Sequence, residues 1–298
     1  MEARLVWDTW RRILTDDHLV DLVLRPGSSV ESEAPDLTAD ELAILKDYAS
    51  TPVATETNIG MYRRGLVRNA LGALSLVPLT ENLLYLSGLD VDEVAENYVR
   101  AIGYADYGPN FWQTAAGFVD YLTTLPEFAS QVWKEVLALD AATIALARRL
   151  GASAVDVWPE DAVIDLSETG SLVDREVTRF VANRAAVVVS SSHDLTGWIE
   201  NPYDFDVNEE LEASTRHWLI YFPKAEGEHE YAELSLRSAR AFNFLSTPKT
   251  VTEVSVALDG LPAAEVIEVM NSLAQLGVVL VQGDSEFTST YSSNKVFQ

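Results

Sequence analysis

Apolar residues recur at helical spacing through the first half of the chain. An apolar stripe along residues 1–24 predicts one amphipathic helix. Its members are Leu5, Trp10, Ile13, Leu14 and Val20. The stretch that follows, residues 26–36, is rich in proline, serine and acids, which predicts a linker.

Helix start and stop signals divide the region up to residue 151. Thr38 with Glu41 forms a capping-box pattern, which predicts a helix running toward Tyr48. Further start signals are Asp90 with Glu93, Asn110 ahead of the stripe that includes Phe118 and Leu122, and Pro126 ahead of the last helix. Arg148, Arg149 and Gly151 predict where that last helix ends.

The periodicity changes in the second half. Ala185–Ser190 is a β-branched run that predicts a buried strand, and His217–Phe222 with His229–Leu234 predicts a hairpin. Helices are then expected at Ser235–Leu245, after the capping box of Thr250 and Glu253, and at Pro262–Leu276. Gly277 ends the last helix, and Val278–Val281 predicts a closing strand.

This order predicts an α+β protein, in which an all-helical N-terminal domain precedes a winged-helix-like α+β peptide-recognition domain. We expect an N-terminal helix and linker over residues 1–36 and a helical domain over residues 37–155. The winged-helix-like domain is expected over residues 156–284, and a polar tail over residues 285–298.

Composition narrows the classes of partner. Hydrophobic residues make up 48% and charged residues 22% of the 298 residues, which is ordinary for a globular protein. The net charge of −25 is not ordinary, and it repels phosphate backbones and anionic membranes. The N-terminus lacks a signal-peptide pattern, no window is apolar enough to span a membrane, and there is no cysteine. We therefore expect a cytoplasmic protein that binds neither nucleic acid nor membrane.

Sites for independent chemistry are not apparent. The four histidines are scattered, so none pairs with another at metal-ligand spacing. No glycine-rich phosphate loop and no Gly-x-Ser-x-Gly elbow occurs. The sequence therefore favours a non-catalytic subunit without a cofactor of its own, although a hydrolase with a triad assembled from distant residues stays an alternative.

The helix–turn–helix pattern near the C-terminus raises the question of DNA. Its second helix, Pro262–Leu276, contains Glu265 and Glu268 but no Lys or Arg, so it lacks the cations that bind phosphates. A winged-helix transcriptional regulator remains the alternative function. A peptide that adds to an exposed strand and lies against a helix fits the acidic surface better. We expect Trp218, Ile220, Phe222, Glu265 and Glu268 to bind it, while the alternative for the first three is that they are core residues of a central strand.

Several stretches follow an order known from one family. They are residues 58–73 (NIGMYRRGLVRNALGA), Pro78-Leu79-Thr80, the helix capped by Asp90, residues 109–125, the helix to Leu150, HWLIYF at 217–222, the helix from Ser235 and residues 249–279. This order resembles the partner proteins of multinuclear iron-dependent oxidases, enzymes that modify ribosomally made peptides. It is most similar to the longer partners of 3-thiaglutamate-type pathways, over residues 40–155 and 215–282.

The resemblance implies a division of labour. The iron ions belong to the separate oxidase subunit, and this chain binds that subunit and helps to present a precursor peptide. Phe111 and Trp112, with the cluster Arg63, Arg64 and Arg68, are the residues we expect at the oxidase. The arginines can bind partner carboxylates, because the guanidinium group forms paired hydrogen bonds with them. The other interpretation is that they lie on a solvated helix face and offset part of the negative charge of the chain.

Overall fold

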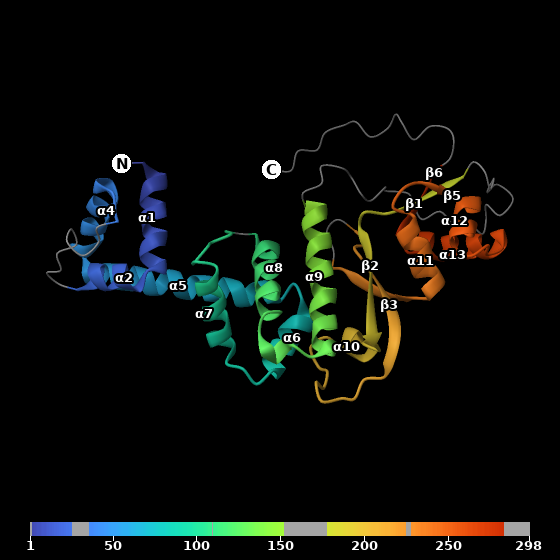
Figure 1. Cartoon of the computed structure of the whole chain (residues 1–298), viewed down its shortest axis with the longest axis horizontal. Coiled ribbons are helices and arrows are strands. Elements are labelled where there is room, and N and C mark those ends of the chain that lie inside the picture. Colours follow the sequence, from blue (N-terminus) through green and yellow to red (C-terminus); the bar gives the residue numbers. More distant parts are fainter. Residues whose placement is uncertain (1, 26–35, 109, 152–177, 225–227, 283–298) are drawn as a thin grey trace. The chain divides into compact units, whose positions relative to one another are not determined.

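The computed structural model describes residues 2–25, 36–108, 110–151, 178–224 and 228–282 (Figure 1). Its internal contacts divide the chain into two compact units, Met1–Ala129 and Ser130–Gln298. The described part of the first unit is helical, and the second combines helices with two small antiparallel sheets. The α+β class and the helical N-terminal part are therefore confirmed. Residues 26–35 of the predicted linker, all of residues 156–177 and the polar tail lie outside the described residues.

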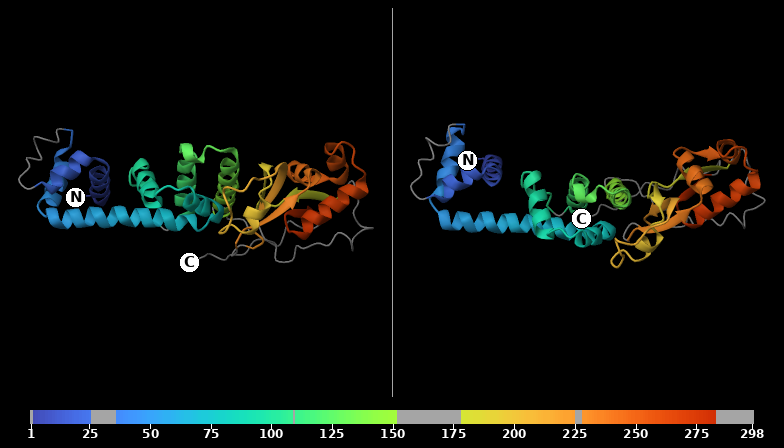
Figure 2. Two further views of the ribbon diagram at one scale, coloured as in Figure 1. Left: turned by 90° about the horizontal axis from the view of Figure 1, so that it is seen from below. Right: turned by 60° about the horizontal axis from the view of Figure 1, so that its bottom comes forward.

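The helices of the first unit pack around α5, which Figures 1 and 2 show as one long helix. In chain order the elements are α1 (Ala3–Thr15), α2 (Asp17–Leu24), α4 (Ala39–Ala49), α5 (Pro52–Leu74), α6 (Pro78–Leu86), α7 (Val91–Ala101), α8 (Phe111–Leu122) and a 3-10 turn, η1 (Pro126–Phe128).

Three predicted caps are present in the first unit. Thr38 and Glu41 form the reciprocal capping box of α4, Asp90 accepts hydrogen bonds at the start of α7, and Asn110 does so at the start of α8. These side chains satisfy backbone N–H groups that have no partner within the helix. The start of each of these helices is therefore set by local chemistry that the sequence displays.

Two predicted helices begin elsewhere. The expected single helix over residues 1–24 is two helices, because the Asp16 side chain accepts hydrogen bonds from the backbone of His18 and Leu19 and starts α2. Pro126 does not open the long helix that follows, but lies in η1. That long helix, α9 (Gln131–Gly151), begins after Ser130, whose hydroxyl oxygen accepts from the Trp133 N–H at 3.2 Å.

The second unit begins with α9 and contains two three-stranded sheets. Its remaining elements are β1 (Arg179–Ala182), β2 (Ala186–His193), α10 (Thr196–Glu200), β3 (Ala213–Tyr221), β4 (Glu230–Leu234), α11 (Leu236–Phe244), β5 (Lys249–Thr250), α12 (Val251–Ala257), α13 (Ala263–Gln275) and β6 (Val279–Gln282). One sheet has the order β2-β3-β4 and the other β5-β1-β6. The predicted strand at residues 185–190, the hairpin and the closing strand are therefore confirmed.

The β2-β3-β4 sheet is covered on both faces, by α9 and by α11 (Figure 1). Cross-strand partners share a face, so Ile220 and its partner Tyr231 lie together. Thr143 of α9 lies 3.4 Å from the Tyr231 hydroxyl, which assigns α9 to this face. Leu219 points to the opposite face and packs into the core that includes Phe242 of α11.

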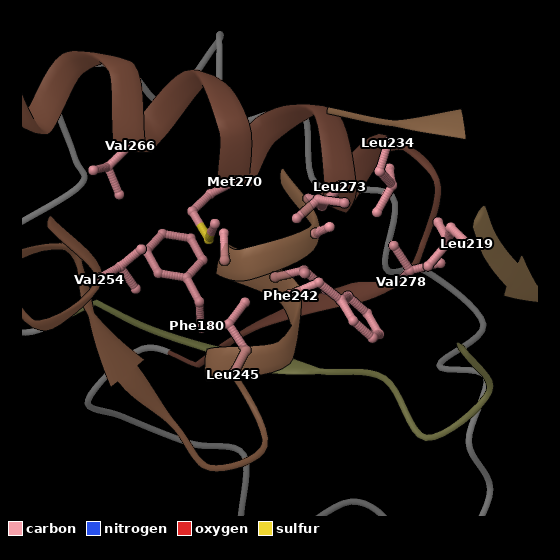
Figure 3. Packing of buried hydrophobic residues seen from close by; sticks show 14 of the residues in the cluster. Phe180, Leu219, Leu234, Phe242, Leu245, Val254, Val266, Met270, Leu273 and Val278 are labelled. Atoms are coloured by element: carbon pink, nitrogen blue, oxygen red, sulfur yellow. The ribbon is translucent and has the colours of Figure 1, made fainter. Parts of the chain in front are cut away.

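The core of the second unit joins α11, α12 and α13 to both sheets. In Figure 3, Met270 and Leu273 of α13 point toward Phe180 of β1 and Phe242 of α11, and all four are buried. The chain reverses between α12 and α13 at Gly260, whose φ of +79° favours glycine. Within the described residues, no helix is both long enough and apolar enough to cross a membrane.

The division into units differs from the predicted domain bounds. The helical domain was expected to extend to residue 155, but α9 packs against β2 and β3 and groups with the second unit. The apolar stripe of α9 predicts a buried face without indicating what covers it. The domain bounds stay a prediction.

Candidate functional site

The β4 strand is one of the two edge strands of the β2-β3-β4 sheet. In the described part of the chain, β4 pairs along its length with β3, and its other edge has no strand beside it. A strand exposes alternate N–H and C=O groups at such an edge. Glu230 and Glu233 of β4 are exposed, so the edge carries negative charge.

Three side chains predicted to bind peptide are buried. Trp218 is 3% exposed and Ile220 is fully buried, both on the sheet face under α9, and the Trp218 indole donates to the Ser191 hydroxyl oxygen at 2.9 Å. Phe222 is 9% exposed and its ring lies 5.9 Å from that of His229. These residues are core residues here, so their burial does not agree with direct peptide contact.

The two acids predicted on α13 lie at the surface. Glu265 accepts a hydrogen bond from Arg237 of α11 at 3.0 Å, between two exposed side chains, and Glu268 is exposed. The helix beside β4 is α11, while α13 packs against α11, α12 and β6. Glu265 and Glu268 therefore add to the acidic surface of the unit rather than bordering the β4 edge.

A buried carboxylate joins α9 to β2. Glu135 is 7% exposed and accepts hydrogen bonds from the Ser192 N–H at 3.0 Å, the Ser192 hydroxyl and Gln131. His193 Nδ1 lies 3.1 Å from Glu135 Oε2. Burial raises the pKa of Glu135, but the hydrogen bonds from Ser192, Gln131 and His193 outweigh it and hold that pKa below its ordinary value. The sequence did not indicate this site, because its members are far apart in the chain.

These three groups resemble a hydrolase triad in composition but not in arrangement. In a working triad the serine donates to one imidazole nitrogen and the acid accepts from the other. Here Ser192 Oγ donates to Glu135, and both Ser192 and Glu135 face the same nitrogen of His193. The cluster holds the irregular end of β2 against α9, and its geometry does not relay a proton.

The Arg216 guanidinium links β3 to its neighbours. It lies 2.7 Å from Asp194 and 2.7 Å from Glu233 of β4. Hydrogen bonds from Thr196, aided by the charge of Arg216, lower the pKa of Asp194. The network therefore anchors the edge strand to the sheet through its side chains.

The histidines do not gather into a metal site. His18 is exposed, His217 Nδ1 lies 2.8 Å from Ser190 Oγ, and His229 lies between the rings of Phe222 and Tyr231. Across the described ranges, no group of three or more His, Cys, Asp or Glu side chains is placed to hold a metal ion.

The three arginines predicted to meet a partner divide into two roles. Arg63 is used within the first unit, since it donates to the Leu14 carbonyl oxygen at 2.6 Å and lies over the Tyr104 ring at 4.6 Å. Arg64 and Arg68 are exposed and form no ion pair with any described residue. The predicted cluster is therefore reduced to an exposed pair.

Aromatic side chains form an open groove between α1 and α5 that the sequence prediction missed. It has a volume of about 660 Å³ and includes Trp7, Met61 and Gly65 in its lining. Trp7 meets Tyr62 edge to face at 6.0 Å. Phe111 and Trp112 of α8 were predicted at the partner surface. Phe111 is exposed and Trp112 is half-buried, and neither lines this groove. Helical spacing indicated a buried stripe on α1, but not a groove beside it.

No protein-family model matches this chain, and no curated protein matches it in sequence.

Proposed function

We propose that this chain is an accessory subunit that binds a multinuclear iron-dependent oxidase and presents a precursor peptide to it. In this proposal the chain acts in the cytoplasm, the oxidase holds the iron, and this chain contributes binding rather than chemistry. The observation that carries the proposal is the β4 edge, a main-chain surface at the border of a well-packed unit.

Strand addition is a general way to hold an extended peptide. Main-chain hydrogen bonds to an edge strand supply affinity, and neighbouring side chains supply selectivity. The β4 edge is anchored by the Arg216 network and backed by α9 and α11, so it is held rigidly before the peptide arrives. Pre-organisation lowers the entropic cost of binding.

A winged-helix-like recognition domain is part of the proposal. The order α11, β5, α12, α13 and β6 supports it, with α12 and α13 joined by a tight turn and β6 closing the motif. The middle position of the β5-β1-β6 sheet is taken by β1, which precedes the motif in the chain. Neither α12 nor α13 contains Lys or Arg, so binding to peptide is favoured over DNA.

The charge near β4 indicates the chemistry of the peptide. Glu230 and Glu233 are exposed on the strand, with Glu233 paired to Arg216, and Glu265 and Glu268 on α13 add negative charge to the unit away from the β4 edge. We expect a leader with Lys or Arg near its docked segment. Added salt should weaken binding in part, because exposed charges are screened while main-chain bonds are not.

Proline scanning of β4 tests the proposal. Backbone N–H groups of successive strand residues point to opposite edges of the strand. One of the two variants Ala232→Pro and Glu233→Pro therefore removes an N–H donor from the open edge, and the other removes a hydrogen bond to β3. We expect the open-edge variant to lose peptide binding while its far-UV circular dichroism and melting stay near wild type. Binding is measured by fluorescence anisotropy with the precursor peptide encoded beside the oxidase gene.

Two outcomes would contradict the proposal. One is that both proline variants fold and bind the peptide as wild type does. The other is that the purified chain and the neighbouring oxidase elute as two unconnected species in size-exclusion chromatography at micromolar concentration. A gene neighbourhood with neither a barrel-type iron oxidase nor a short precursor would also count against it.

A further inference from the structure

The groove between α1 and α5 is built from aromatic side chains that are packed against one another. Trp10 lies 5.0 Å from Tyr48 and 6.4 Å from Tyr62, measured between ring centroids. The outer members of the groove remain accessible, since Trp7 is 42% and Met61 55% exposed. A rigid inner wall with exposed apolar rims is the usual form of a surface that receives an apolar anchor.

The groove exists because α1 and α5 pack against α2 and α4 rather than closely against each other. Each of them contacts both of these helices, and the Trp7–Tyr62 contact bridges the space between them. In Figure 1, α1 stands across the direction of α5.

The α5 side of the groove has the length of a short helix. Asn58, Met61, Gly65 and Asn69 line it at intervals of three or four residues, which is one stripe of α5. At 1.5 Å per residue this stripe extends about 16 Å, or three helical turns. Gly65 leaves open space where a Cβ atom would lie, so another helix can approach closely at the centre of the stripe.

The α5 side of the groove carries positive charge in a chain whose total charge is strongly negative. Residues 57–76 contain no acid, whereas the chain carries a net charge of −25. Arg64 and Arg68 follow the stripe on α5, are exposed, and have no ion-pair partner among the described residues. The Arg64 guanidinium lies over Gly60, where a Cβ would come within 3.2 Å of Nη1. Of the lining residues only Asp106 is an acid, and its Oδ1 already accepts from the Gly108 N–H at 2.8 Å.

We propose that this groove binds an acidic amphipathic helix of a protein partner, with an apolar anchor seated over Gly65 and carboxylates at Arg64 and Arg68. Helix-in-groove recognition places apolar side chains at helical spacing in such a groove, and guanidinium groups form paired hydrogen bonds with carboxylates. The inference rests on the proposed function only for naming the oxidase as the partner. The groove and the β4 edge belong to different units, and each is tested separately.

The test uses the full chain and two labelled helical peptides. One has Leu and Trp anchors flanked by Glu, and the other has Lys in place of every Glu. The charge of the whole chain predicts that the acidic peptide is repelled, so its binding would be specific to the groove. We expect Gly65→Leu, which fills the groove, and the double variant Arg64→Glu/Arg68→Glu each to weaken binding of the acidic peptide at least tenfold in fluorescence anisotropy.

Matched controls separate the groove from folding and from charge. Gly72 lies on the same helix, is exposed and also has open space at its Cβ position, so Gly72→Leu should bind as wild type. Leucine favours the helix over glycine, so both leucine variants should keep their fold. Lys134→Glu/Arg148→Glu on α9 makes the same change in net charge and should leave binding unchanged. The Lys peptide should bind equally to wild type and Gly65→Leu.

The outcomes are distinguishable from those of the proposed function. The inference is overturned if the acidic peptide does not bind wild type, or if Gly65→Leu and Gly72→Leu bind it equally. If the acidic peptide behaves as expected but the oxidase does not bind, the groove stands and the oxidase assignment fails. If the oxidase binds wild type and both leucine variants equally, the accessory function stands and the groove is not its docking site.

Discussion

Replacing Glu135 tests whether the buried carboxylate is a structural link between α9 and β2. Glu135→Ala removes the acceptor of the Ser192 N–H, the Ser192 hydroxyl and Gln131. A hydrogen bond to a charged group contributes about 1.5–3 kcal/mol, and a buried donor left without a partner costs about 1–3 kcal/mol. Because water reaches part of Ser192, we expect the loss of stability for each bond to lie near the lower end of these ranges. The expected total is about 3 kcal/mol for Glu135→Ala and about 1–2 kcal/mol for Glu135→Gln, which keeps an amide oxygen for Ser192.

The dependence on pH follows from the lowered pKa of Glu135. A carboxylate whose pKa is depressed in the folded state stabilises the protein above its unfolded pKa, here about 4.5. That stabilisation is lost as the pH falls below this value toward the folded pKa, because in this range the unfolded chain takes up a proton while the folded protein keeps Glu135 ionised. The stability difference between wild type and Glu135→Gln should therefore be largest at neutral pH and should narrow below about pH 4.5.

Urea unfolding followed by circular dichroism measures these differences, and hydrogen exchange of peptides from β2 locates them. Glu200→Gln is the control, since Glu200 is an exposed acid in the same unit and its replacement should change stability by less than about 0.5 kcal/mol. The structural role would be refuted if Glu135→Ala were as stable as wild type at pH 7. It would also be refuted if the stability difference between wild type and Glu135→Gln stayed constant down to pH 3.

Three further predictions follow from packing, local bonding and the assignment of iron to the partner. A Cβ atom on Gly117 would lie 2.6 Å from the Tyr98 hydroxyl oxygen. Gly117→Ala should therefore lower the thermal midpoint of the wild-type protein but not that of the Tyr98→Phe variant, which lacks that oxygen. Equal decreases in both backgrounds would disprove the contact. Arg63→Ala should cost about 1–2 kcal/mol in urea unfolding, because Arg63 bonds the Leu14 carbonyl, while the exposed Arg68→Ala should cost less than about 0.5 kcal/mol. Elemental analysis of the isolated chain should find no tightly held iron, and a stoichiometric amount would contradict the proposed division of labour.

Helix starts are the part of this protein that the sequence determines most directly. The capping boxes of Thr38 and Thr250 and the caps at Asp90 and Asn110 occur as predicted, because each bond joins residues within three positions of one another. The hairpin of β3 and β4 was likewise predictable, since two apolar runs around a short polar stretch leave few alternatives. Local signals also misled in two places: Asp16 caps a second helix inside an otherwise continuous apolar stripe, and Pro126 lies in η1 instead of opening α9.

The partners of each apolar face were decided only by the tertiary structure. Periodicity indicates that Trp218 and Ile220 share a face, but not that α9, far away in sequence, covers it. For the same reason the sequence did not single out Glu135, whose bonds to Ser192 and His193 join α9 to β2. Arg63 and Arg64 are adjacent and chemically identical, yet one bonds the end of α1 and the other is exposed, because successive residues of a helix point about 100° apart. Sequence therefore determines which residues can be buried, capped or charged, and packing over long separations decides which of them remain available to a partner.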